Sequence, residues 1–149
     1  MGSRLSSWLT RTFGRNVRRR EDFVADVRNA LALSPRGGVF RDTLRLETLS
    51  THMQVTWIAR PLHPWDRDLP AFEQDEAFGS QCLHDVDMAI RRLFERFELV
   101  ASLDVVVLHP VSRTSILTGC VLRHEFADAK RLSVPMRLKM VGLQPTRCA

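Results

Sequence analysis

The chain has 149 residues, which is the size of one domain that buries its own hydrophobic core. Its apolar fraction of 44% and charged fraction of 26% are those of a globular protein, and its uninterrupted apolar runs are too short to cross a bilayer. The net charge of +5 is unevenly distributed: residues 1–41 hold nine arginines and three acids, whereas the rest holds 13 of the 22 basic and 14 of the 17 acidic residues.

The first twenty residues contain six arginines and no acid, and we interpret residues 1–20 as a basic amphipathic arm. On a helical wheel, Leu5 and Leu9 share one side with Trp8 and Phe13. The opposite side gathers the basic residues Arg4, Arg11, Arg15, Arg18 and Arg19. Such a helix suits an anionic membrane surface or a protein partner, and its arginines also suit the phosphates of nucleic acid. Docking of the apolar stripe on the chain's own sheet is the alternative.

A single domain is expected over residues 21–149. Gly14 ends the first helix, and a second helix is predicted over residues 21–33, because its apolar residues recur at helical spacing. The Ser-Pro-Arg-Gly-Gly stretch at 34–38 ends it. Alternating apolar residues then predict two strands within residues 42–61, with a turn at Ser50 and Thr51.

A loop, a long helix and a second pair of strands are predicted next. Residues 61–70 form a proline-rich loop, and residues 71–98 hold apolar side chains with a 3.6-residue period, which predicts a long helix. The β-branched run 103–109 predicts a strand buried on both faces, joined by a turn at 110–114 to a second strand at 115–123.

Two short helices are predicted at the end of the chain, over residues 125–132 and 133–143. The second also alternates like a strand, but Ser133 suits an N-cap, Pro135 fits a first helical turn and Gly142 suits a Schellman stop. The expected order is α-α-β-β-α-β-β-α-α. This order predicts an α+β domain with a four-stranded, mainly antiparallel sheet and one long helix across a face.

Two polar clusters are weak candidates for a metal or an acid–base site. The loop cluster holds His63 and Asp66 beside Asp68, and the predicted long helix holds His84 and Asp87 at i, i+3 spacing. A transition metal needs three or four converging ligands, and each cluster offers too few. The alternative to a metal or acid–base site is a structural role for the loop, in which Asp68 caps the long helix and Trp65 covers the edge of the sheet.

No motif indicates nucleophilic catalysis, a nucleotide-binding loop or a bound cofactor. Cys82, Cys120 and Cys148 are odd in number and lack metal-ligand spacing, so we expect free thiols in a reducing compartment. The location is predicted to be the cytoplasm. The acid-free, Arg-rich start also fits targeting to the mitochondrial matrix in a eukaryote.

The sequence therefore favours a non-enzymatic interaction module, which contacts a protein partner or an anionic membrane through its basic N-terminal helix. One alternative is a nucleic-acid-binding protein that uses the same arginines. Another is a small metal-dependent or acid–base enzyme that uses the loop from His63 to Asp68 together with His84 and Asp87.

Overall fold

The computed structural model of the chain describes residues 45–49 and 51–146. Its five strands form one sheet in chain order. They are β1 (Arg45–Leu49), β2 (His52–Ile58), β3 (Ser102–Leu108), β4 (Ser115–Leu122) and the two-residue β5 (Gln144–Pro145). Only β2 and β3 pair in parallel, and the three other pairings are antiparallel. The basic arm and the helix predicted over residues 21–33 lie outside the described residues.

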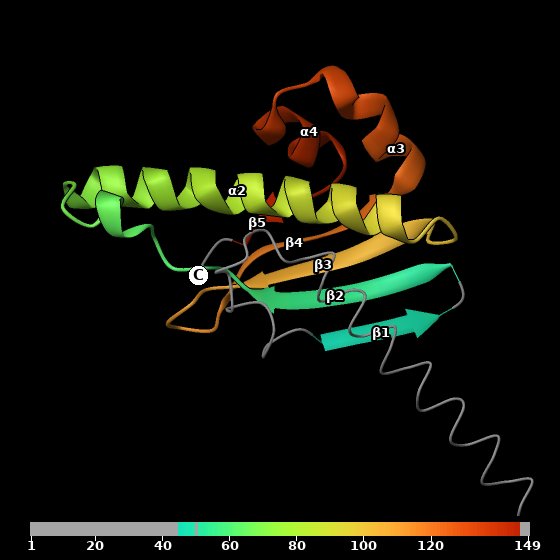
Figure 1. Cartoon of the computed structure of the whole chain (residues 1–149), viewed down its shortest axis with the longest axis horizontal. Helices are drawn as coiled ribbons and strands as arrows, with labels where there is room; N and C mark the ends of the chain where they lie inside the picture. The colour runs from blue at the N-terminus through green and yellow to red at the C-terminus, as the bar shows by residue number, and fades with distance from the viewer. Residues whose placement is uncertain (1–44, 50, 147–149) are drawn as a thin grey trace, which may run out of the picture.

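The parallel pair follows from the connection between β2 and β3. The helix α2 (Ala71–Arg96) links them, and a helical crossover brings the chain back so that the second strand runs beside the first in the same direction. The helices α3 (Arg123–Asp128) and α4 (Val134–Met140) lie on the same side of the sheet as α2 (Figure 1). The predicted α+β class with a four-stranded sheet is confirmed, and β5 adds a short fifth strand.

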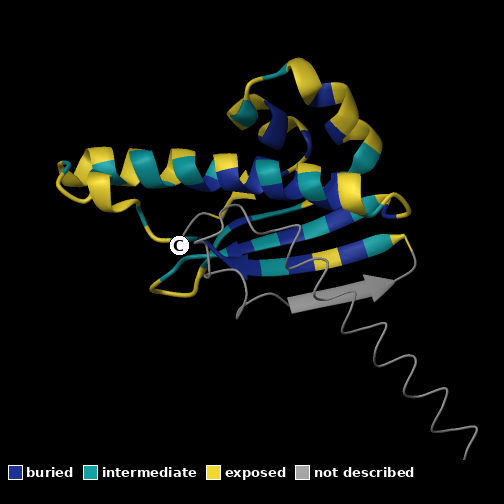
Figure 2. Cartoon of the chain, in the orientation of Figure 1, coloured by how far each residue is buried: buried dark blue, intermediate teal, exposed yellow. Residues whose placement is uncertain are grey.

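The core lies between this helical layer and one face of the sheet. The fully buried side chains include Met53 and Trp57 on β2, Leu103 on β3, and Ile90 and Leu93 on α2. Buried residues of α2 begin only at Cys82, and the first third of the helix is exposed or half-buried, because it extends past the strands (Figure 2).

The prediction that β3 is buried on both faces is wrong. Its residues alternate between buried and half-buried, with Val105 and Val107 in the core and Val106 on the other face. All the described helices cover one side of the sheet, so only every second side chain of β3 reaches the core. A β-branched run therefore does not by itself indicate burial on both faces.

The turn after α4 is the predicted Schellman motif. Gly142 has a φ of 85°, its N–H donates to the carbonyl of Lys139, and the N–H of Leu143 donates to the carbonyl of Leu138 at 3.0 Å. This turn lies directly on β4 at Gly119, where an added Cβ would collide with the carbonyl oxygen of Gly142. A residue without a side chain at 119 is what lets α4 and β5 close against the sheet.

Neighbouring valines on β3 test this one-sided core. We expect Val105→Asp to abolish cooperative unfolding, because it buries an unpaired carboxylate at a cost of several kcal/mol. Val106→Asp should keep a cooperative transition, since its side chain lies on the half-buried face. Thermal unfolding followed by circular dichroism measures both, and equal effects of the two substitutions would contradict the one-sided core.

Candidate functional site

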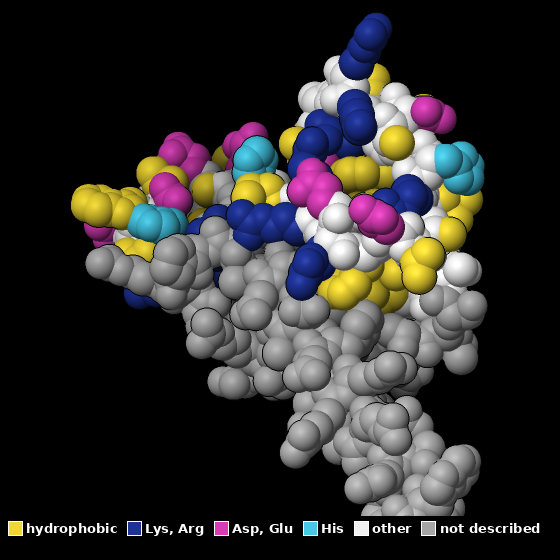
Figure 3. Space-filling model, turned by 45° about the vertical axis from the view of Figure 1, so that its right-hand side comes forward, with side chains coloured by type: hydrophobic (Ala, Val, Ile, Leu, Met, Phe, Trp, Pro, Cys, Tyr) yellow, Lys and Arg dark blue, Asp and Glu magenta, His cyan; other side chains and the backbone are white. Residues whose placement is uncertain are grey.

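A groove between α2 and α3 is the candidate site. Its volume is about 320 Å³. Arg91, Phe94 and Glu95 line it from α2, Arg123, Phe126 and Ala127 from α3, and Lys130 from the 3₁₀ turn η3 (Ala129–Arg131). Figure 3 shows basic side chains interspersed with apolar ones over these helices. The groove thus combines an apolar interior with a basic rim.

Two phenylalanines form the floor of the groove. Phe94 is 5% exposed and Phe126 is 7% exposed, and their ring centroids are 6.0 Å apart with the rings tilted by 50°. The helical period of α2 directs Phe94 toward α3, where it meets Phe126. Because both rings belong to the core, the floor is fixed by the packing of the whole domain.

Arg123 connects the two walls of the groove. Its guanidinium donates to the carbonyl oxygens of Phe94, Phe97 and Val100, which are among the last carbonyls of α2 and the loop that follows. Its Cζ lies 4.7 Å from the centroid of the Phe94 ring. The carbonyls at a helix C-terminus have no partner within the helix, so one arginine satisfies them and attracts the negative end of the helix dipole.

The two other basic residues on the rim have more freedom. Arg91 is 44% exposed, and its Nη2 lies 3.3 Å from Oδ2 of Asp87. Lys130 is exposed, and its ammonium forms no hydrogen bond or ion pair with another described residue. Among the described residues that line the groove, Glu95 is the one acid. Three basic residues and one acid of the described chain therefore line this groove, and of the basic ones only Arg91 and Lys130 are not committed to backbone carbonyls.

Asp87, one of the weak metal candidates, belongs to a buried ion pair next to this groove. It is 4% exposed, and Nη1 of Arg137 on α4 lies 3.1 Å from its Oδ1. Arg137 is 6% exposed, donates to the carbonyl of Leu132 at 3.0 Å and lies over the Phe126 ring. Asp87 therefore joins α2 to α4, and Arg91 extends this ion pair to the edge of the groove.

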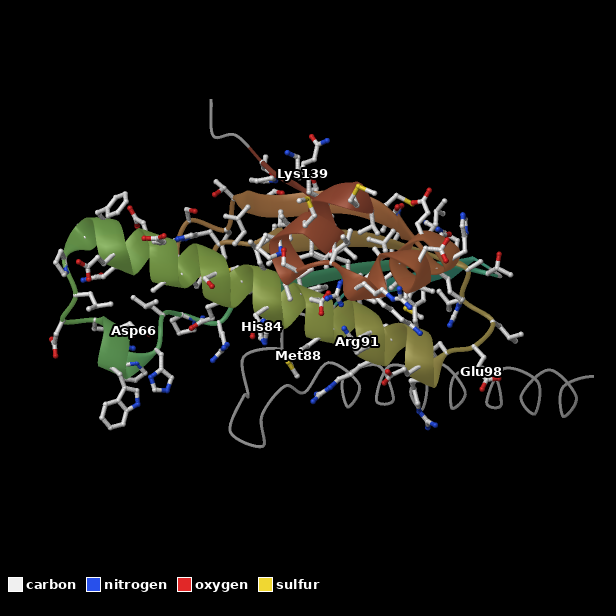
Figure 4. All side chains as sticks on the ribbon, turned by 90° about the horizontal axis from the view of Figure 1, so that it is seen from above. Asp66, His84, Met88, Arg91, Glu98 and Lys139 are labelled. Carbon is white, nitrogen blue, oxygen red and sulfur yellow. The ribbon has the colours of Figure 1, made fainter. Side chains whose placement is uncertain are left out.

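The other predicted metal candidates do not meet at one point. His84 and Asp66 lie well apart along α2 and its preceding loop (Figure 4). His63 is exposed and stacks on Trp65 with ring centroids 6.1 Å apart. Within residues 45–49 and 51–146, no three His, Cys, Asp or Glu side chains group so that they would hold a metal ion.

Two structural predictions for the loop are wrong. Trp65 is 81% exposed and does not plug the sheet edge. Asp68 does not cap α2, because the N-cap is Pro70 without a side-chain hydrogen bond. Instead, the side-chain amide of Gln74 reaches back from the first turns of the helix to the carbonyls of Arg67 and Leu69 and holds the loop there.

A third polar cluster lies on the face of the sheet opposite the described helices, and the sequence did not indicate it. His52 Nδ1 lies 2.7 Å from Oγ of Ser102, and its Nε2 lies 3.0 Å from Oδ2 of Asp104. Burial raises the pKa of Asp104, but hydrogen bonds from Cys120, Gln54 and His52 outweigh it and leave that pKa below its usual value. Asp104 therefore stays charged and orients the imidazole.

These residue types also make hydrolytic triads, but the surroundings do not favour catalysis. Ser102 and Asp104 belong to β3, which lies between β2 and β4, and the N–H groups of a central strand point along the sheet to its neighbours. Such N–H groups do not point out of the face to stabilise an oxyanion. The cluster instead stabilises the parallel register, in which His52 faces Ser102 and Gln54 faces Asp104.

The described cysteines are protected from reaction as nucleophiles. Burial and the neighbouring carboxylate of Asp85 raise the pKa of Cys82 to about 12, against the opposing effect of Arg60. Cys120 is exposed, but partial loss of contact with water and a hydrogen bond to Asp104 raise the pKa of its thiol as well. Because the thiolate is the reactive form, both side chains are weak nucleophiles near neutral pH.

The arm residues predicted to bind an anion or a partner lie outside the described residues. They are Arg4, Trp8, Arg11, Phe13, Arg15, Arg18 and Arg19. The sequence predicted part of the groove. The helical period placed Phe94 on the apolar side of the long helix and placed Arg91 and Glu95 on its outer side. Arg123 and Lys130 carried no signal, because their proximity to α2 depends on how α3 folds back from β4.

Comparison of the chain with protein-family models, with curated proteins and with solved structures gave no match. Among the described helices, none combines the length and the apolar character that a membrane span requires.

Two positions on α2 test whether Asp87 is structural. We expect Asp87→Ala to lower the free energy of unfolding by about 3–5 kcal/mol, because it leaves the buried Arg137 without its counter-charge. His84→Ala is the control, since His84 is exposed on the same helix and should change stability by less than about 0.5 kcal/mol. Urea unfolding measures both, and an Asp87→Ala protein as stable as the control would contradict the assignment.

Proposed function

We propose that the chain is a non-enzymatic interaction module that contacts an acidic protein partner. The observation that carries this proposal is the distribution of charge. The surplus of six positive charges lies in residues 1–41, while the remaining residues hold 13 basic and 14 acidic side chains. Charge confined to one segment serves association with a partner rather than the fold. The groove supports the proposal, because it places three more basic residues around an apolar floor.

The arm supplies both contact types that an interface needs. Its arginines attract acidic side chains and form bidentate pairs with carboxylates. Trp8 and Phe13 belong to the residue types that carry most of the binding energy at interfaces, together with arginine. A partner with a neutral surface would leave these arginines without counter-charges, so we favour an acidic one.

Three other functions have less support. An anionic membrane would take the same arm with its aromatic residues inserted, and nucleic acid would take the arginines alone. An enzyme built on His63, Asp66, His84 and Asp87 would need these side chains to converge. Asp87 is bound to Arg137, and His63 stacks on Trp65 in the loop before α2. We propose the cytoplasm as the location, with the mitochondrial matrix as the alternative that the Arg-rich arm leaves open.

Matched charge variants of the full chain test the arm. Replacing Arg15, Arg18 and Arg19 with glutamine should weaken binding to poly-glutamate at least tenfold, roughly the effect of losing one charge-assisted contact. The control replaces Arg67, Arg131 and Lys139 with glutamine, which removes the same charge from exposed positions of the body. Fluorescence anisotropy at two salt concentrations measures the affinities.

The partner class is tested with the same two proteins and with a third in which Trp8 and Phe13 are replaced by alanine. Phosphatidylserine vesicles and a DNA duplex replace poly-glutamate as probes. Binding that needs Trp8 and Phe13 and occurs only on vesicles would assign the arm to a membrane, and tight binding to the duplex alone would assign it to nucleic acid. Equal losses in the arm variant and the control would mean that net charge acts without a defined site, which would overturn the proposal.

A further inference from the structure

We propose that the groove between α2 and α3 binds a short segment of a partner protein in which a glutamate or an aspartate adjoins an apolar side chain. The inference rests on the proposed function, since the occupant belongs to the acidic partner. It adds a second contact, distinct from the arm, and it names the residues of this chain that form it.

The floor of the groove selects an apolar group. Phe94 and Phe126 present aromatic carbon at its base, and Ala127 forms part of its wall. The two rings are 5% and 7% exposed, and such small surfaces do not allow a nucleobase of a nucleic acid to stack on either of them. A branched aliphatic or aromatic side chain that reaches down to this floor would remove the remaining apolar area from water.

The rim of the groove selects a carboxylate rather than a phosphate. Every nitrogen of the Arg123 guanidinium already donates to a backbone carbonyl, so its planar fork is turned away from a ligand. Lys130 is a single ammonium, and Arg91 shares its charge with Asp87. The two cations Arg91 and Lys130, set against Glu95, leave one positive charge on the rim, which matches a singly charged carboxylate better than a doubly charged phosphate.

Glu95 favours a peptide as the source of this carboxylate. A doubly charged phosphate on the rim would be repelled by Glu95, which lines the same groove. A peptide carries backbone N–H donors beside its acidic side chain, and a rim carboxylate accepts hydrogen bonds from them. With a volume of about 320 Å³, the groove is at the lower end of the range for ligand pockets, which suits one or two side chains.

The two lysines of the chain provide a matched test. Lys130 lies on the rim of the groove and Lys139 lies on α4, and both are exposed. The probe is a fluorescent peptide of alternating glutamate and leucine, added to the full chain. Lys130→Glu should weaken its binding at least tenfold, roughly the effect of losing a charge-assisted contact, whereas Lys139→Glu changes the net charge equally and should weaken it less than about threefold.

A second variant blocks the groove without changing its charge. Ala127→Phe places a ring at the exposed lip, so it should weaken binding of the same peptide by at least about tenfold, with unchanged circular dichroism. Peptides with serine in place of leucine, or glutamine in place of glutamate, should also bind more weakly. These results support a site that needs both the charge and the apolar side chain.

Two outcomes would overturn the inference. Equal effects of Lys130→Glu and Lys139→Glu would show that the peptide responds to overall charge. Undiminished binding of the serine-containing peptide would show that the apolar floor is not used. If the arm variant still loses poly-glutamate binding, only the groove is refuted and the proposed function stands. If the groove variants lose the peptide while the arm variant binds poly-glutamate normally, the proposed role of the arm is refuted.

Discussion

The guanidinium of Arg123 is the interaction on which the arrangement of the helices depends. It donates to the carbonyls of Phe94, Phe97 and Val100, so it joins the end of α2 and the loop before β3 to the first residue of α3. The carbonyl of Phe97 also accepts the backbone N–H of Val100, so what Arg123 adds is a set of side-chain hydrogen bonds that ties this helix end to α3. Because α3 begins at this residue, its position relative to α2 is fixed here, and the groove between the two helices exists as a consequence.

The second constraint is that the helical layer lies on one side of the sheet. Side chains on β2 and β3 alternate between the two faces of the sheet. Trp57 and Val105 therefore lie in the core, whereas His52 and Asp104 lie on the face opposite the described helices. The hydrogen bonds among His52, Ser102 and Asp104 add side-chain pairing to the parallel ladder, which lacks a tight turn to set its register.

Local patterns in the sequence predicted the helices and strands of the described residues well, but they did not predict contacts between distant segments. The 3.6-residue period predicted α2, and Gly142 predicted the turn after α4, because both depend on neighbouring residues. The sequence did not predict the position of Val106, since the number of covered faces is a property of the whole sheet. The groove was not predicted for the same reason, because Lys130 comes near Phe94 only when α3 folds back against α2. Asp87 could not be distinguished from a metal ligand until Arg137 was seen beside it.

NMR chemical-shift mapping shows which residues of the full, isotopically labelled chain respond when it is titrated with the glutamate–leucine peptide. If the basic, aromatic-floored groove binds an acidic and apolar segment of a partner, the largest shifts occur at Arg91, Glu95, Ala127 and Lys130, with smaller ones in the arm. Shifts confined to residues 1–20, or centred on the sheet face around His52, would contradict this binding site.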